Sequence, residues 1–115
     1  MQIVCGDSPK AAASACSGVA TSTAIFFSGL RLRASVMAAE LAAVGIDADC
    51  IPTLDVVRPE THPFLMNRCY GRDPAVVARI GRAVAEGLMA GGVLPVMKHM
   101  PGHGLSHVDT HHDLP

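Results

Sequence analysis

The sequence has 115 residues, which suffices for one small domain or for part of a larger one. Half of the residues are hydrophobic but only 3% are aromatic, so a core must be built mainly from Ala, Val, Leu, Ile and Met. This composition favours helices packed on a short buried sheet over a β-sandwich. The net charge of −1 and the lack of a basic stripe argue against nucleic acid as a partner.

The sequence also indicates a compartment. No apolar run reaches the length of a membrane span, and the first residues lack the basic and apolar regions of a secretory signal. The four cysteines, Cys5, Cys16, Cys50 and Cys69, show no CxxC pair and no regular spacing. We therefore expect reduced thiols, a cytoplasmic location and no membrane partner.

The first part of the chain gives little structural information. Residues 1–29 carry only Asp7 and Lys10 as charged groups, and we expect them to be poorly ordered or loosely packed. Residues 25–27 fit either a strand or the start of a helix, because the periodicity does not distinguish the two.

A helix is predicted from Leu30 to Val44, with an apolar stripe at helical spacing made by Leu30, Ala34, Met37, Leu41 and Val44. Gly45 predicts its end, since glycine accepts the left-handed conformation there. Residues 46–52 then predict a short strand that ends at Pro52, and residues 53–57 continue along the rim of the sheet.

Residues 58–72 predict a long connecting loop, a feature that is often functional in a small domain. Asp73 and Pro74 then predict a helix start, with Asp73 as the cap and Pro74 in the first turn. Its buried stripe comprises Val77, Ile80, Val84 and Leu88, and Arg82 and Glu86 are expected to pair on its outer face. Gly91 and Gly92 end this helix before a short strand over residues 93–97.

Two apolar strands joined by a helix indicate a right-handed parallel α/β unit. In such units functional groups gather at the carboxyl ends of the strands. Asp55, Arg68 and the titratable cluster within residues 98–111 all follow a predicted strand, so we expect them on one side of the sheet.

The cluster contains four histidines spaced four residues apart: His99, His103, His107 and His111. On a helix this spacing would place them on one face, as zinc ligands often lie. Pro101, Gly102 and Gly104 exclude a helix here, so we predict no metal and no other cofactor. A histidine-rich metal- or ligand-binding module remains the alternative from another functional class.

A catalytic interpretation rests on the residue types. Asp109 and His111 are two residues apart, so in an extended segment their side chains point the same way, and a carboxylate beside an imidazole makes a competent general acid/base. Lys98 and Arg68 can donate hydrogen bonds to sugar hydroxyls or to an anion. Asp55 is either an orienting group or a turn residue.

The segment Lys98-His99-Met100-Pro101-Gly102-His103-Gly104, followed by Asp109-Thr110-His111, resembles the KH(F/I)PGHG…D(S/T)H signature of bacterial β-N-acetylhexosaminidases of glycoside hydrolase family 3, the NagZ type. Residues 42–47, 52–56 and 67–74 are similar to the same family in the same order. The likeness covers about residues 34–115 and leaves residues 1–33 as a separate, poorly defined segment.

This resemblance implies that His111 is the acid/base that protonates the leaving glycosidic oxygen and that Asp109 is its partner. It implies that Lys98, His99 and Arg68 bind N-acetylglucosamine, with Asp55 and His103 as candidates for supporting them. The implied substrate is the N-acetylglucosaminyl–anhydromuramyl peptide of peptidoglycan recycling. The family uses an aspartate nucleophile and forms a covalent glycosyl-enzyme, so it departs from the two-carboxylate scheme only in its histidine acid.

The resemblance also implies the fold, a TIM (β/α)8 barrel, which typically needs ≈ 250 residues. Residues 34–115 would form about two β/α units of it, as a partial glycoside hydrolase family 3 barrel domain. The family's nucleophile and its DxEGGxVxR segment have no counterpart in this sequence. We therefore expect no hydrolysis by these 115 residues alone, and a non-catalytic remnant is a further alternative.

Overall fold

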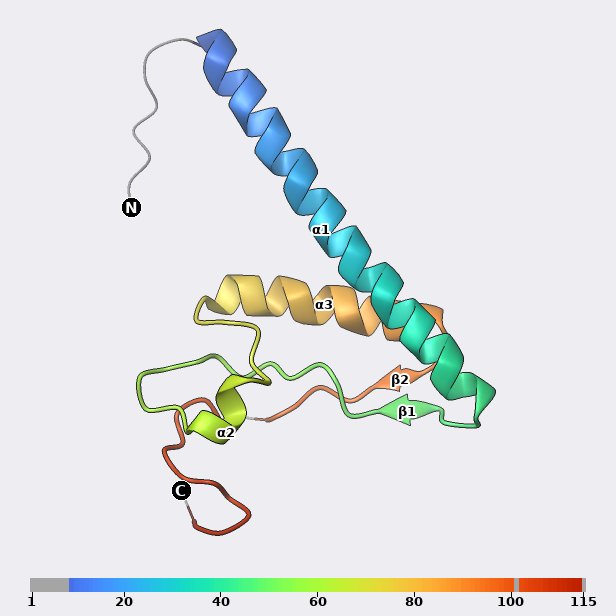
Figure 1. The fold of residues 1–115 in the computed structure, drawn as a ribbon, viewed down its shortest axis with the longest axis vertical. Helices are drawn as coiled ribbons and strands as arrows, with labels where there is room; N and C mark the ends of the chain where they lie inside the picture. Colours follow the sequence, from blue (N-terminus) through green and yellow to red (C-terminus); the bar gives the residue numbers. More distant parts are fainter. Residues whose placement is uncertain (1–8, 101, 115) are drawn as a thin grey trace.

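The computed structural model describes residues 9–100 and 102–114, with side chains from residue 23 onward. Three helices and two short strands follow one another in the order α1 (Pro9–Ala43), β1 (Ala48–Asp49), α2 (Pro63–Met66), α3 (Pro74–Ala90) and β2 (Leu94–Pro95). Figure 1 shows α1 and α3 crossing on one side of the paired strands. The protein is thus an α/β protein, as predicted.

Helix α1 is much longer than the sequence analysis predicted. It already begins at Pro9, so residues 9–29 are helical, and residues 1–8 lie outside the described part; the expected loose packing of this segment stays a prediction. Alanine is abundant here and has the highest helix propensity, which explains a helix without a clear apolar stripe. The helix ends at Ala43, and Gly45 has a φ of +82°, as expected of a left-handed stop.

The contact between α1 and α3 depends on small residues. Ala34 and Ala38 of α1 are buried against α3, whereas Val44, which periodicity placed in the stripe, is 73% exposed. A Cβ at Gly87 would collide with the carbonyl oxygen of Arg31, and one at Gly91 would lie 2.7 Å from the carbonyl oxygen of Ser35. These two glycines therefore allow the helix backbones to approach closely.

The prediction for α3 is confirmed. Asp73 accepts a hydrogen bond from the amide of Ala75 at 2.8 Å, and Pro74 occupies the first turn. The predicted apolar stripe is buried, and Arg82 Nε lies 2.8 Å from Glu86 Oε1 on the exposed face. The core that this stripe helps to form comprises Ala34, Ala38, Ile80, Val84, Leu88 and Val93.

The two strands are parallel, as predicted, although each is shorter than expected. Ala48 pairs with Leu94 and Asp49 with Pro95. The segments that follow β1 and β2 remain paired, because Lys98 forms a parallel bridge with Thr53 and its amide donates to the Pro52 carbonyl at 3.1 Å. The Ile51–Pro52 and Lys98–His99 peptide bonds are cis.

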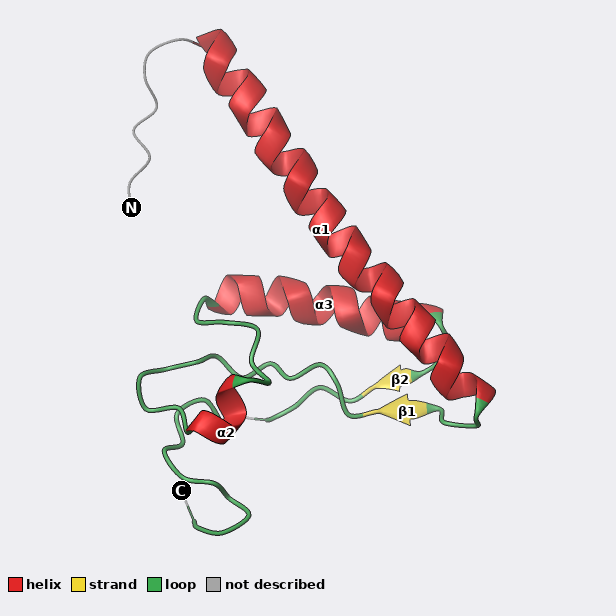
Figure 2. Ribbon diagram, in the orientation of Figure 1, coloured by secondary structure: helices red, strands yellow, loops and turns green. Residues whose placement is uncertain are grey.

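The connection between β1 and α3 contains a helical turn that was not predicted. Figure 2 shows α2 within an otherwise irregular stretch. His62 caps α2 and Pro63 starts it, while Leu65 is fully buried and anchors it. The arrowheads of both strands point toward the side where α2 and the C-terminal loop lie (Figure 1). Within the described residues no helix is long and apolar enough to span a membrane.

Candidate active site

The carboxylate of Asp55 connects two segments of the candidate site. Its side chain is completely buried, and its two oxygens serve different partners. Oδ2 lies 2.5 Å from Nδ1 of His99, and Oδ1 accepts a hydrogen bond from the backbone amide of His103 at 2.6 Å. A buried carboxylate needs such partners. The Asp55 carboxylate is bonded to Nδ1 of the half-buried His99 ring, so Nε2 of that ring stays available for a ligand.

The glycine-containing loop is fixed by close contacts from two other segments. Gly102 has a φ of +135°, and a Cβ at Gly104 would collide with the carbonyl oxygen of Val56. The buried hydroxyl of Thr61 donates to the carbonyl of Gly104 at 2.5 Å. The glycines therefore give the loop both its turn and its close approach to the segment that carries Asp55.

Asp109 and His111 form the predicted contact. Oδ1 of Asp109 lies 2.6 Å from Nδ1 of His111 and also accepts the His111 backbone amide at 3.0 Å. These hydrogen bonds, the backbone one first, hold the pKa of Asp109 below its ordinary value. The His111 side chain is 74% exposed, so its ring is open to a bound molecule.

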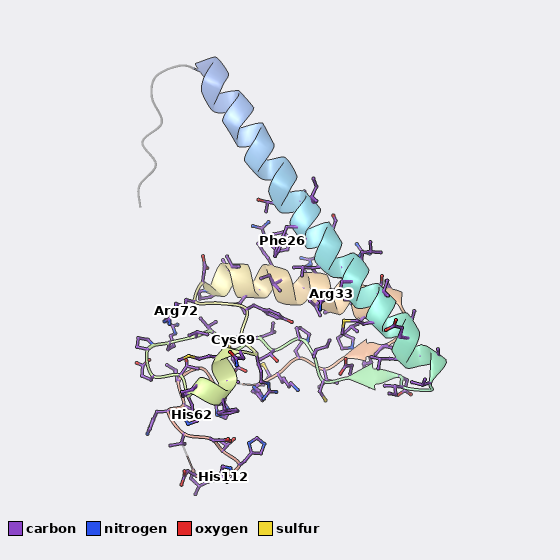
Figure 3. All side chains as sticks on the ribbon, in the orientation of Figure 1. Phe26, Arg33, His62, Cys69, Arg72 and His112 are labelled. Carbon is purple, nitrogen blue, oxygen red and sulfur yellow. The ribbon has the colours of Figure 1, made fainter. Side chains whose placement is uncertain are left out.

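A ring cluster lies between these two pairs. Phe64, the second residue of α2, packs edge-to-face on His103 at 5.7 Å between ring centroids and on His111 at 6.3 Å. His103 in turn lies 5.5 Å from the ring of His99. Side chains of α2 and of the C-terminal loop, including His62 and His112, are on the same side in Figure 3. The cluster links the Asp55–His99 pair to the Asp109–His111 pair.

Two hollows open beside these groups. One of about 320 Å³ is formed within the C-terminal loop by Gly102, His103, Leu105, Ser106, His107 and Thr110. A second, of about 190 Å³, is lined by Leu54, Asp55, Val56, Arg58, Gly102, Gly104 and Leu105. A third hollow, between α1, α3 and the strands, is lined mainly by apolar side chains and contains no carboxylate or imidazole. The first two hollows therefore contain Asp55, His103 and His107, whereas Asp109 and His111 line neither of them.

The structure brings together most, but not all, of the predicted site residues. Asp55, His99 and His103 meet directly, which favours the orienting role for Asp55. Lys98 is half-buried and adjoins His99 at the bridge to Thr53. Arg68 is exposed after the end of α2. The pKa of the thiol of its neighbour Cys69 is raised, first by burial and second by the nearby carboxylate of Asp55.

Two contributors were missed by the sequence analysis, Phe64 and Thr61. Both lie in the segment expected to be an irregular loop. The signal that could have indicated the helical turn is Pro63, since proline is favoured at the first position of a helix.

A metal site receives no geometric support in the part of the chain that the structure describes. There, no group of three or more His, Cys, Asp or Glu side chains is arranged to hold an ion. No helix forms between residues 98 and 114 among those described, so the histidines do not share a helical face.

The fold and the site define an α/β protein with a candidate active site at the carboxyl ends of its parallel strands. A profile of the Glycosyl hydrolase family 3 N terminal domain matches residues 13–115, and the chain belongs to this family. The match begins within the segment 1–33 that the sequence analysis set apart; the boundary at residue 34 stays a prediction.

Individual relatives agree with this assignment. The chain is 40% identical over 82 residues to beta-hexosaminidase A of Pseudoalteromonas piscicida, covering 71% of this chain and 14% of the relative. Zn-bound CbsA from Thermotoga neapolitana matches with a TM-score of 0.73 and 30% identity, over 77% of this chain and 19% of the other. NagZ from Neisseria gonorrhoeae, solved with N-trifluoroacetyl-D-glucosamine, matches with a TM-score of 0.63 and 37% identity, over 68% and 23%. The chain thus spans a quarter or less of each of these relatives.

Proposed function

We propose that this chain carries the sugar-binding and acid/base residues of a β-N-acetylglucosaminidase active site. In this proposal Lys98, His99 and Arg68 bind the N-acetylglucosamine unit. His111 donates a proton to the leaving glycosidic oxygen, and Asp109 fixes the ring orientation and stabilises the imidazolium. The full reaction is hydrolysis of a terminal β-linked N-acetylglucosamine with retention.

The observation that carries this proposal is the hydrogen-bonded contact between Asp109 and the exposed His111 ring, beside a second imidazole oriented by a buried carboxylate. Nδ1 of His111 is engaged by Asp109, so Nε2 is the nitrogen that can exchange a proton with a ligand. Nε2 of His99 can likewise exchange a hydrogen bond with a sugar hydroxyl. The hexosaminidase relatives and the glucosamine derivative bound to NagZ support this choice of sugar.

We also propose the setting in which the site works. The two β/α units would belong to a (β/α)8 barrel, where catalytic groups project from the carboxyl ends of the strands. The substrate would be the N-acetylglucosaminyl–anhydromuramyl peptide released during peptidoglycan recycling, in the cytoplasm. The resemblance places the aspartate nucleophile outside these 115 residues, so we expect the polypeptide of this sequence to bind the sugar without hydrolysing it.

Sugar binding to variants tests the proposal. The 115-residue chain should bind N-acetylglucosamine, and Lys98→Ala or His99→Ala should weaken binding about tenfold or more, because each loses a hydrogen bond that involves a charged or polarised group. Arg82→Ala is the matched control, since it removes an exposed cation from the outer face of α3. Titration calorimetry or ligand-observed NMR gives the dissociation constants.

Two results would contradict the proposal in different ways. Equal affinity of the wild type and of the Lys98→Ala/His99→Ala double variant would show that the sugar is not bound here. Release of 4-nitrophenol from 4-nitrophenyl N-acetyl-β-D-glucosaminide by this polypeptide, abolished by His111→Ala, would instead overturn the expected absence of turnover.

A further inference from the structure

Phe64 occupies a place in the candidate site that the sequence does not predict. Its ring contacts three imidazoles: His62 at 5.2 Å, His103 at 5.7 Å and His111 at 6.3 Å between centroids. The latter two pairs are nearly perpendicular, at 83° and 80°, which is the preferred edge-to-face geometry of aromatic rings. One phenyl ring thus touches both the oriented half of the site and the acid/base half.

The backbone around Phe64 is fixed to the same loop that it contacts. Leu65 is fully buried, and the amide of His62 donates to the carbonyl of Ser106 at 3.1 Å. Thr61 is buried and bonded to Gly104. The ring is therefore held relative to residues 104–106 by neighbours on both sides, and it does not depend on His111 for its own position.

His111, by contrast, has few constraints. Its hydrogen bonds go to Asp109, two residues away in the same loop, and its side chain is largely exposed. Among the described residues, Phe64 is the one ring outside the C-terminal loop that is recorded in contact with His111. Asp109 can set the tautomer and tilt of the imidazole, but a contact beyond the loop is needed to place the dyad relative to the sugar-binding residues.

We propose that Phe64 is a positioning residue that places the His111–Asp109 dyad against the sugar-binding residue His99, which Asp55 orients. It acts through ring packing, on His111 directly and on His103, whose backbone amide is bonded to Asp55 and whose Nε2 is buried without a hydrogen-bond partner in the described structure. This inference rests on the proposed function and assigns to it a residue that has no acid, base or hydrogen-bonding chemistry of its own.

The imidazole resonances of the 115-residue chain provide the test. In Phe64→Leu, the Cε1–H resonance of His111 should change, because the ring contact is lost. Phe64→Tyr keeps the ring and should keep the wild-type His111 signal. Phe26→Leu, the same substitution at an exposed ring on α1, should leave His111 unaffected (Figure 3).

An unchanged His111 resonance in Phe64→Leu would overturn the proposal. If Phe64→Leu disturbs every histidine signal by unfolding the loop, Phe64→Tyr decides: a His111 signal like that of the wild type supports positioning by the ring, and a displaced signal refutes it. Failure of the wild type to bind N-acetylglucosamine would refute the proposed function separately, because the His111 readout does not require the sugar.

Discussion

The carboxylate of Asp55 holds two parts of the site with a single side chain. It contacts the His99 ring with one oxygen and the backbone of the glycine-containing loop with the other. Both partners are donors, and the side chain has no contact with solvent. A side chain at position 55 must therefore accept two hydrogen bonds, and a carboxylate has the two acceptor oxygens that this requires.

We predict that Asp55→Asn destabilises the fold by about 1.5–3 kcal/mol, the usual cost of losing a hydrogen bond to a charged group. Asparagine has nearly the same shape, but its NH₂ group would face either the His99 ring or the His103 amide, donor against donor. Urea denaturation followed by circular dichroism measures the change.

Asp47→Asn serves as the control, because Asp47 is exposed near the start of β1. This substitution should change the free energy of unfolding by less than about 0.5 kcal/mol. Equal stability of Asp55→Asn and Asp47→Asn would show that the Asp55 contacts do not support the fold.

The Asp109–His111 dyad has a pH dependence whose sign follows from its hydrogen bonds. The His111 backbone amide and ring hold the pKa of Asp109 below its ordinary value of 3.8. The charged carboxylate is therefore favoured in the folded chain, and its stabilisation is present above the ordinary value. It is lost as the pH falls through the lowered folded-state pKa.

We expect the ¹³C carboxyl resonance of Asp109 to titrate at lower pH in the wild type than in His111→Ala. The substitution removes the ring hydrogen bond but keeps the backbone amide, so the pKa should rise part of the way toward its ordinary value. The same midpoint in both proteins would mean that the ring does not interact with the carboxylate in solution.

At the scale of helices, the close crossing of α1 and α3 depends on glycines that sequence propensity alone disfavours. Glycine in a helix interior costs about 0.5–1 kcal/mol relative to alanine. Gly87 nevertheless sits against Ala34 and the Arg31 carbonyl, where a methyl group has no room.

We predict that Gly87→Ala lowers the thermal midpoint, because overpacking a helix contact typically costs about 1–3 kcal/mol. Gly29→Ala is the matched control: nothing lies within 4 Å of its Cβ position, so alanine should stabilise α1. Calorimetry measures the thermal midpoints of both variants. Equal midpoints of Gly87→Ala and Gly29→Ala would contradict this prediction.

The same scale shows what a sequence can predict. Helix α3 was predictable because Asp73-Pro74 fixes its start and four apolar residues repeat at helical spacing. The parallel strands followed from the order of elements, as did the expectation that Asp55 and residues 98–111 lie on one side of the sheet, but the contact of Asp55 with His99 was not predicted. Helix α2 was not predictable from periodicity, since Pro63–Met66 is shorter than two turns. The role of Phe64 depends on contacts with residues far along the chain, and no local pattern reveals these.

Helix α1 is longer than the sequence pattern predicts. Its first half lacks an apolar stripe and carries Lys10 as its one charged residue, so the sequence predicts little order there. Its alanines favour a helix without an apolar stripe, although Gly18 and the Ser and Thr residues have lower propensities. Figure 1 shows that this part of α1 extends past α3, so its sequence has no apolar stripe of the kind that packing against another helix requires.

For the molecule as a whole, exposed apolar side chains occur both at the candidate site and on other parts of the surface. The candidate site lies beyond the carboxyl ends of the strands. Large apolar side chains are exposed beside it, as Met100 and Leu105 are, and also away from it, including Leu32 and Val36 on α1 and Leu94, Val96 and Met97 in and after β2. Exposed apolar groups and an open sheet edge promote association. Stabilities of variants should therefore be compared at one low protein concentration.

The central claim is that N-acetylglucosamine binds at the carboxyl ends of the two strands, beside the two imidazole–carboxylate pairs. A residue-resolved NMR titration of the chain with this sugar tests it most directly. We predict saturable shifts at Lys98, His99 and His111, and none at Arg82 on the outer face of α3. No saturable shift, or shifts confined to the hollow lined by Arg33 and Tyr70 between α1 and the strands, would contradict the claim.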